Sequence, residues 1–185
     1  MSCGCGKKAG ALHTAMAIES QQLLAPSQWG PILWNYLHCL AESIGRSGNT
    51  IVDTDQATFL ENMISALPLI LPCQTCQTHA AAYLERTPAP TLRGLYGAAL
   101  QQAARSWLFY FHNYVRALNQ QPTMLLSVDE CAVMYANCTV SRRDYTAFVQ
   151  TAAAAVRQGW VRIENWRKWY SYSERIRILS GNMVL

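Results

Sequence analysis

The chain has 185 residues, of which 51% are hydrophobic and 14% are charged, and its net charge is +4. This composition excludes a disordered chain and supplies enough apolar residues for one packed domain with an extension. No apolar run reaches the roughly 18 residues that a membrane-spanning helix needs, and the N-terminus lacks the apolar stretch of a signal peptide. We therefore expect a soluble protein that is not exported by that route.

The chain is predicted to open with a mobile arm, residues 1–26, in which Cys3 and Cys5 are flanked by glycines. A core helix follows from residue 27 to about 44, because its apolar residues recur at helical spacing. Gly30, Trp34 and His38 form a second stripe on this helix, at i, i+4 and i+8. Each could simply pack in the core, but a single stripe of the three suggests the wall of a pocket.

Three more helices are predicted before residue 120. The second is expected to be capped near Asp53 or Thr54 and to end at Pro68. The third begins near Cys73 and runs to about Arg86, and the fourth runs from about residue 92 to 119 after a proline-rich turn. No stretch alternates polar and apolar residues at period two, so the fold class is predicted to be all-α.

Cys73 and Cys76 form a C-x-x-C pair directly after Pro72. A proline there favours a helix that starts at the first cysteine, which places both sulfurs at a helix N-terminus, where a thiolate is stabilised. The same spacing serves redox disulfides and zinc sites, and the motif alone leaves both open. Attachment of c-type haem is excluded, because Gln77 stands where that motif needs a histidine.

Six of the seven cysteines lie in close pairs, and Cys39, the seventh, is predicted to be a buried free thiol. In the zinc alternative, a helical interaction module would bind the metal through Cys73, Cys76 and His79, closed by Cys131 or Cys138. His79 could equally stabilise a Cys76 thiolate or lie on the surface. A non-catalytic helical protein is a third alternative, and it leaves more of these residues unexplained.

The fourth helix carries polar residues on one face of a very aromatic segment. His112, Val115, Arg116 and Asn119 follow at i, i+3, i+4 and i+7. Buried polar groups of this kind need partners, since an unsatisfied one costs about 1–3 kcal/mol. Either a bound ligand or neighbouring backbone could supply them.

Three motifs occur in order: Trp29-Gly30-Pro31 with Trp34 and His38, then Cys73-x-x-Cys76, then Trp107 with His112-Asn113-x-Val115. Together they resemble the Erv/ALR family of FAD-linked sulfhydryl oxidases, over residues 27–120. The resemblance implies a small helical bundle, four helices plus extra ones, that holds FAD, with residues 121–185 as a helical C-terminal extension. The residues that it implies for FAD binding are Trp29, Gly30, Trp34, His38, His112, Asn113, Val115 and Asn119.

The resemblance also implies a reaction. A protein dithiol, such as that of a thioredoxin-like carrier, would reduce the Cys73–Cys76 disulfide directly or through Cys3 and Cys5 as a shuttle pair. Cys73 would exchange disulfides with the dithiol, Cys76 would react with the flavin, and oxygen would be reduced to hydrogen peroxide. The family also implies a homodimer.

The chain departs from the family pattern at several points. Arg116 stands in the motif after His112-Asn113 and could pair with the pyrophosphate of FAD. No cysteine lies between Cys76 and Cys131, so the usual structural disulfide lacks its upstream partner, and Cys131 and Cys138 could bond to each other instead. These departures are similar to members encoded by large DNA viruses, which would place the protein in the host cytoplasm or the virion. A cellular member would be expected in the mitochondrial intermembrane space.

After Ser141 the tail carries eight Arg and Lys against three Asp and Glu, mixed with tryptophans. Such a segment could contact nucleic acid, an anionic membrane surface or a partner protein. The favoured alternative is a terminal helix that packs its tryptophans on the bundle and leaves its cations in solvent.

Overall fold

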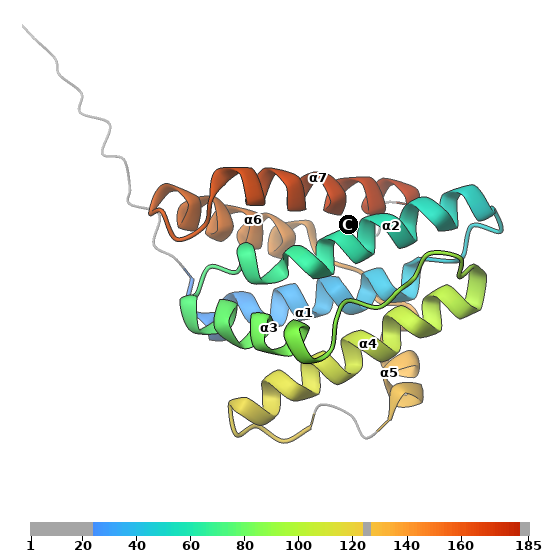
Figure 1. Ribbon diagram of the computed structural model, residues 1–185, viewed down its shortest axis with the longest axis horizontal. Coiled ribbons are helices and arrows are strands. Elements are labelled where there is room, and N and C mark those ends of the chain that lie inside the picture. The colour runs from blue at the N-terminus through green and yellow to red at the C-terminus, as the bar shows by residue number, and fades with distance from the viewer. Residues whose placement is uncertain (1–23, 124–126, 182–185) are drawn as a thin grey trace, which may run out of the picture.

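The computed structural model describes residues 24–123 and 127–181, and every regular element in these ranges is helical (Figure 1). The predicted all-α class is therefore confirmed. The predicted shuttle cysteines Cys3 and Cys5 lie outside the described residues. The helices are α1 (Pro26–Ser43), α2 (Thr50–Ala66), the 3₁₀ helix η1 (Leu67–Leu69), α3 (Gln74–Arg86), α4 (Gly97–Leu118), α5 (Val128–Tyr135), α6 (Arg142–Arg157) and α7 (Ile163–Leu179).

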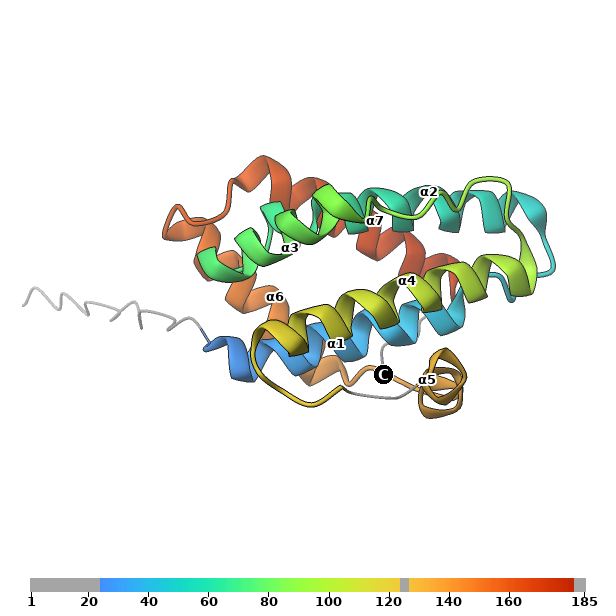
Figure 2. The same cartoon turned by 60° about the horizontal axis from the view of Figure 1, so that its bottom comes forward.

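The three sequence motifs lie on α1, at the start of α3 and on α4. α1 packs against α4 (Figure 2), and η1 connects α2 to α3. Pro31 lies inside α1, and Pro68 in η1 marks the end of α2, as expected from its missing backbone N–H. None of the helices in the described ranges has both the length and the apolar character needed to cross a bilayer.

Two predicted helix starts are wrong. α2 begins at Thr50, because the side chain of Asn49 accepts a hydrogen bond from the Ile51 amide and caps the helix four residues before Asp53. The buried Asp53 carboxylate instead accepts a hydrogen bond of 2.8 Å from the amide of Gly97. That contact lies at the start of α4, which begins at Gly97 and not near residue 92.

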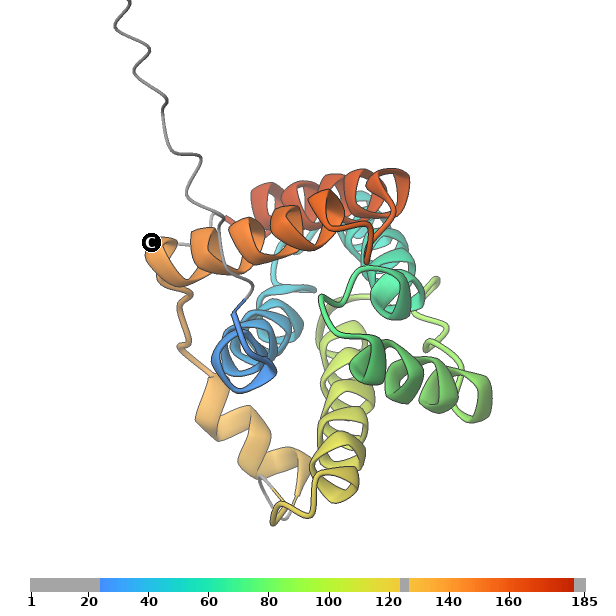
Figure 3. The same ribbon diagram turned by 90° about the vertical axis from the view of Figure 1, so that its left-hand side faces the viewer.

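The C-terminal helices share one core with the bundle. α6 packs on α1 and α7 on α2, as the end-on view of Figure 3 shows. Trp166 and Trp169 are buried in the same apolar cluster as the α1 and α2 side chains. A buried hydrogen bond of 2.6 Å joins Tyr36 of α1 to Ser173 of α7. The tail thus packs Trp166 and Trp169 on the bundle, as the favoured alternative predicted, whereas Trp160 is exposed.

The cysteine pairing outside the C-x-x-C differs from the prediction. Cys39 of α1 is bonded to Cys138, with 5.5 Å between their Cα atoms, and Cys131 is a buried free thiol. The predicted Cys131–Cys138 bond is therefore wrong, and so is the predicted free thiol at Cys39. The reason is tertiary: α5 packs against α1 and α4, and the turn after it carries Cys138 to the side of α1 where Cys39 lies.

Candidate functional site

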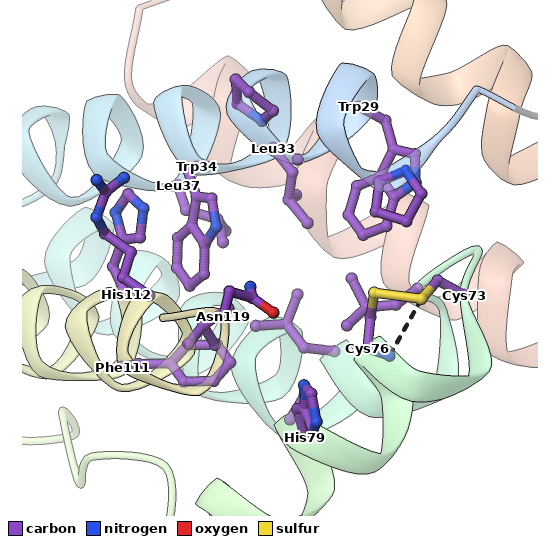
Figure 4. Close-up of a pocket in the computed structure, with 18 of the residues that line it drawn as sticks. Trp29, Leu33, Trp34, Leu37, Cys73, Cys76, His79, Phe111, His112 and Asn119 are labelled. Atoms are coloured by element: carbon purple, nitrogen blue, oxygen red, sulfur yellow. Dashed lines mark hydrogen bonds between the residues drawn. A yellow bond between two sulfur atoms is a disulfide. The ribbon is translucent and has the colours of Figure 1, made fainter. Parts of the chain in front are cut away.

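A pocket of about 730 Å³ lies between α1 on one side and α3 and α4 on the other. Figure 4 shows the Cys73–Cys76 disulfide toward one end of it and His112 toward the other, with Trp34 and Phe111 between them. Most of the wall is aromatic or aliphatic, and Arg116 is its single Lys or Arg side chain among the described residues. Such a site suits a large, flat, mostly apolar ligand with one anionic part.

The two sulfurs lie at the N-terminus of α3, as the motif predicted, and they form a disulfide. Cys73 is the N-cap residue, and its Sγ accepts a hydrogen bond of 3.2 Å from the amide of Cys76 (Figure 4). Both cysteines are partly buried and both line the pocket. The first backbone N–H groups of a helix lack partners within it, so a thiolate formed here is stabilised by them and by the helix dipole.

Aromatic rings from α1 and α4 stack at the other end of the pocket. The rings of Trp34 and His112 lie parallel with 4.0 Å between their centroids, and Phe111 meets Trp34 edge to face at 5.2 Å. His38 lies behind this stack, with Nε2 at 3.0 Å from Nδ1 of His112. On its far side Tyr135 of α5 stacks on His38 at 4.6 Å. Two helices and the extension therefore fix the orientation of both imidazoles.

Both histidines are neutral at neutral pH because they are buried. Burial lowers the pKa of His38 to about 4, and burial, with the nearby His38 and Arg116 as smaller causes, lowers that of His112 to about 3. The Sγ of Cys131 lies 3.6 Å from Nδ1 of His38. Burial raises the pKa of this thiol to about 11, so Cys131 keeps its proton.

The structure brings most of the predicted cofactor residues to the pocket. Its lining includes Trp29, Gly30, Trp34, His112, Val115, Arg116 and Asn119. His38 and Asn113 do not line it, and His38 sits one layer behind His112. His79 lines the pocket three residues after Cys76 and is half-buried.

Some lining residues were not predicted. Leu33 and Leu37 belong to the apolar residues that predicted a core helix over residues 27–44, and they are both core and pocket wall. Tyr135 comes from the extension and also lines the pocket. It lies far along the chain from the three motifs, so nothing in the motifs predicted that it would reach the pocket. The sequence did indicate that Tyr135 and Cys131 lie on the same face of α5, because they are four residues apart.

A loop from the extension lies beside the C-x-x-C. The side chain of Gln77 donates hydrogen bonds to the Leu71 carbonyl at 2.8 Å and to the Trp160 carbonyl at 3.3 Å. Trp160 lies between α6 and α7 and is 50% exposed. This arrangement places the backbone of an exposed tryptophan next to the first turn of α3.

The structure does not leave the four predicted cysteine ligands of the zinc alternative available for a metal. Cys73 and Cys76 are bonded to each other, Cys138 is bonded to Cys39, and Cys131 is in contact with His38. Within residues 24–123 and 127–181 no group of three or more His, Cys, Asp or Glu side chains is placed to hold a metal ion.

Comparison with known proteins places this site in context. The model of the Erv1 / Alr family matches residues 31–135, which includes both walls of the pocket and the disulfide. The chain is 28% identical over 99 residues to protein 096R of Invertebrate iridescent virus 3, provisionally named an FAD-linked sulfhydryl oxidase. It is 31% identical over 94 residues to the FAD-linked sulfhydryl oxidase of African swine fever virus.

These alignments cover 54% and 50% of this chain, and 61% and 70% of the two viral proteins. The chain therefore spans about three fifths of the length of the first relative. No solved structure gives a significant match. The likeness to viral proteins agrees with the resemblance inferred from the departures in the motifs.

Proposed function

Because the chain belongs to the Erv1/Alr family, we propose that it is an FAD-dependent sulfhydryl oxidase that makes disulfide bonds in protein substrates and reduces oxygen to hydrogen peroxide. The observation that carries the proposal is the Cys73–Cys76 disulfide at the N-terminus of a helix and in the wall of an aromatic pocket. The names of the two viral relatives support the same activity.

The pocket fits FAD in size and in chemistry. Its volume of about 730 Å³ falls in the range of roughly 300–1,000 Å³ usual for ligand sites. Trp29 is buried, and its Nε1 has no hydrogen-bond partner among the described residues, so an acceptor on a ligand could satisfy it. Arg116 supplies a positive charge for the pyrophosphate, and Trp34 and His112 supply flat surfaces for the rings. When bound, the flavin supplies the two-electron acceptor and the reactivity with oxygen.

The thiol chemistry belongs to the two cysteines. A substrate thiolate would attack Cys73 Sγ, forming a mixed disulfide and releasing Cys76 as a thiolate at the helix N-terminus. The second substrate thiolate would then attack the substrate sulfur, forming the substrate disulfide and releasing Cys73. Two electrons would thus move from the substrate dithiol to the Cys73–Cys76 pair. The assignment of Cys76 to the flavin side comes from the family resemblance.

Cys3 and Cys5 are proposed as the pair that passes electrons to Cys73. Residues 26 and 27, at the start of α1, line the same pocket as Cys73. The twenty residues from 6 to 25 could span at most about 70 Å, at roughly 3.3–3.6 Å per residue, so the length of the chain allows the contact. Direct reduction by a protein dithiol, such as a thioredoxin-like carrier, is the alternative route.

Homodimer formation is also a proposal. α6 covers one side of α1, and α7 covers α2, so two copies would have to meet through other faces. Expression in a virus-infected cell, in the host cytoplasm or in the virion, is proposed from the two viral relatives. Sedimentation of the purified protein tests the dimer.

The deciding experiment is an absorption spectrum of the purified protein, combined with oxygen uptake in the presence of a dithiol. We expect flavin bands and thiol-dependent oxygen uptake. Cys76→Ser should keep the flavin and lose the uptake, whereas Cys131→Ser, a matched change of a cysteine that takes no part in disulfide exchange, should keep both. A colourless protein that neither binds added FAD nor consumes oxygen would overturn the proposal.

A further inference from the structure

A continuous line of buried groups runs from the extension to the pocket. Cys131 Sγ lies 3.6 Å from Nδ1 of His38, and Nε2 of His38 lies 3.0 Å from Nδ1 of His112. The three side chains come from α5, α1 and α4, and their residues are 0%, 1% and 6% exposed. Only His112 of the three reaches the pocket wall. Its Nδ1 faces His38, so Nε2 is the ring nitrogen that remains for a ligand.

The position of Cys131 is well determined by its surroundings. Ser127 caps α5, and its hydroxyl accepts a hydrogen bond from the Glu130 amide. Tyr135, one turn after Cys131, stacks on His38. Cys138 follows shortly and is bonded to Cys39, the residue next to His38. The disulfide and the stacked ring therefore hold the thiol against one particular imidazole.

The two hydrogen bonds that link Cys131, His38 and His112 can both be donated in either of two directions. At neutral pH the thiol carries one proton, and each neutral imidazole carries one. In one direction the thiol donates to His38 and His38 donates to His112, which leaves N–H on Nε2 of His112. In the other, both hydrogen bonds are reversed, the sulfur is the acceptor, and Nε2 of His112 has a bare lone pair.

The first direction is favoured by the chemistry of the two end atoms. A thiol sulfur is a weak acceptor, whereas an imidazole nitrogen is a good one. Among the described residues, Nδ1 of His38 is the acceptor that the structure offers to the Cys131 hydrogen. Reversal would leave that hydrogen in the buried interior without this acceptor and would exchange a good acceptor for a poor one.

We propose that Cys131 is a positioning residue that sets the tautomer of His38, and through it that of His112, so that His112 presents an Nε2–H donor to the pocket. The hydrogen bond on one ring nitrogen decides which form the other takes. His112 would then bind an acceptor atom of the ligand without having to rearrange its own proton. The identity of that ligand as FAD rests on the proposed function, but the tautomers do not.

The test is ¹⁵N NMR of the histidine side chains in the full-length protein, as purified, because ring nitrogen shifts and couplings distinguish the two neutral tautomers. We expect both His38 and His112 as the Nε2–H form. In Cys131→Ala the Nδ1–H form of His38 should rise from undetectable to a substantial share, and Cys131→Ser, which keeps a donor, should restore the wild-type pattern. Met134→Ala, on the exposed side of the same helix, is the control and should change neither tautomer.

Binding of FAD to flavin-stripped full-length protein gives the second readout. Loss of one hydrogen bond to the ligand should raise the dissociation constant in Cys131→Ala by about three- to tenfold, with Cys131→Ser within about twofold of wild type. An Nδ1–H form of His38 in the wild type overturns the proposal, and this result needs no variant to fold. Unchanged tautomers in Cys131→Ala, or a shifted tautomer with unchanged affinity, also overturn it. Wild-type protein that binds no FAD refutes the proposed function, while the NMR result still decides the tautomers.

Discussion

Nε2 of His38 and Nδ1 of His112 lie 3.0 Å apart, although 74 residues separate them in the chain. The contact joins α1 to α4 behind the pocket wall, and both rings are almost fully buried. Two imidazoles in this position tolerate no added charge, because a proton on either would be poorly solvated and close to the other ring. The pair therefore makes the stability of the protein depend on pH.

The free energy of unfolding should fall as the pH is lowered from about 6.5 towards 4. The pKa of His38 is about 4 and that of His112 about 3 in the folded protein, both below the usual value of about 6.5, so in this window the unfolded chain binds protons that the folded chain does not. Each histidine contributes a slope of up to about 1.4 kcal/mol per pH unit. Urea unfolding at several pH values between 5 and 7 measures how the free energy of unfolding changes with pH.

The variant His38→Gln isolates this effect. It removes one of the two titrating rings, so the difference between its slope and that of the wild type should approach the contribution of one histidine. Equal slopes for the two proteins would show that His38 is not the source of the pH dependence.

The ion pair between Glu42 and Arg105 should be essential for stability. Glu42 of α1 accepts from two nitrogens of Arg105 of α4, and the side chains are only 5% and 11% exposed. Arg105→Met would leave a buried carboxylate unpaired, which should cost about 3–5 kcal/mol of unfolding free energy. Adding Glu42→Gln should recover much of that loss.

The exposed pair of Arg162 and Glu164 provides a matched control for denaturant unfolding, because its side chains are 79% and 69% exposed. Arg162→Met should change stability by less than about 1 kcal/mol. Similar losses in the two single variants would contradict the assigned importance of burial.

Loss of the Cys39–Cys138 bond should destabilise the protein. The bond closes a loop with a sequence separation of 99 residues, and cross-links of this kind contribute about 2–4 kcal/mol, largely by restricting the unfolded chain. We expect Cys39→Ser with Cys138→Ser to lower the melting temperature markedly, as followed by circular dichroism. The control variant Cys131→Ser should not lower the melting temperature markedly. A double variant as stable as the wild type would show that packing of α5 alone holds the extension.

Trp160 should affect protein substrates and not small ones. Trp160 is 50% exposed, and its carbonyl accepts a hydrogen bond from Gln77 in the first turn of α3. A folded substrate that reaches Cys73 is therefore expected to contact this residue, whereas dithiothreitol is not. Trp160→Ala should raise the KM for a reduced thioredoxin-like protein by about fivefold or more and leave that for dithiothreitol unchanged.

Ile51 is 73% exposed at the far end of α2 from α3 (Figure 1), and Ile51→Ala is the control for this kinetic comparison. An equal rise in KM for both substrates of Trp160→Ala would mean that the substitution disturbs the C-x-x-C itself.

Local patterns in the sequence were sufficient for the helices and for the main parts of the site. The C-x-x-C after Pro72 predicted two sulfurs at a helix N-terminus. The stripe of Gly30, Trp34 and His38 predicted one pocket wall, which Gly30 and Trp34 do line, whereas His38 lies one layer behind it. Helical periodicity is encoded by residues three or four apart, so such faces are visible without a structure. Helix boundaries were less visible, because Asn49 and Asp53 are both good caps and only the contact with Gly97 assigns Asp53 another role.

The sequence by itself determined the helical class, the family and the residue types that meet at the pocket, because each depends on short-range spacing. Only the tertiary structure decided that Cys138 bonds to Cys39, that Cys131 contacts His38, and that the carbonyl of Trp160 accepts a hydrogen bond from Gln77. Each of these pairs joins segments more than eighty residues apart. Their pairing follows from how α5, α6 and α7 pack on the bundle, and no local pattern records which face of one helix will meet which face of another.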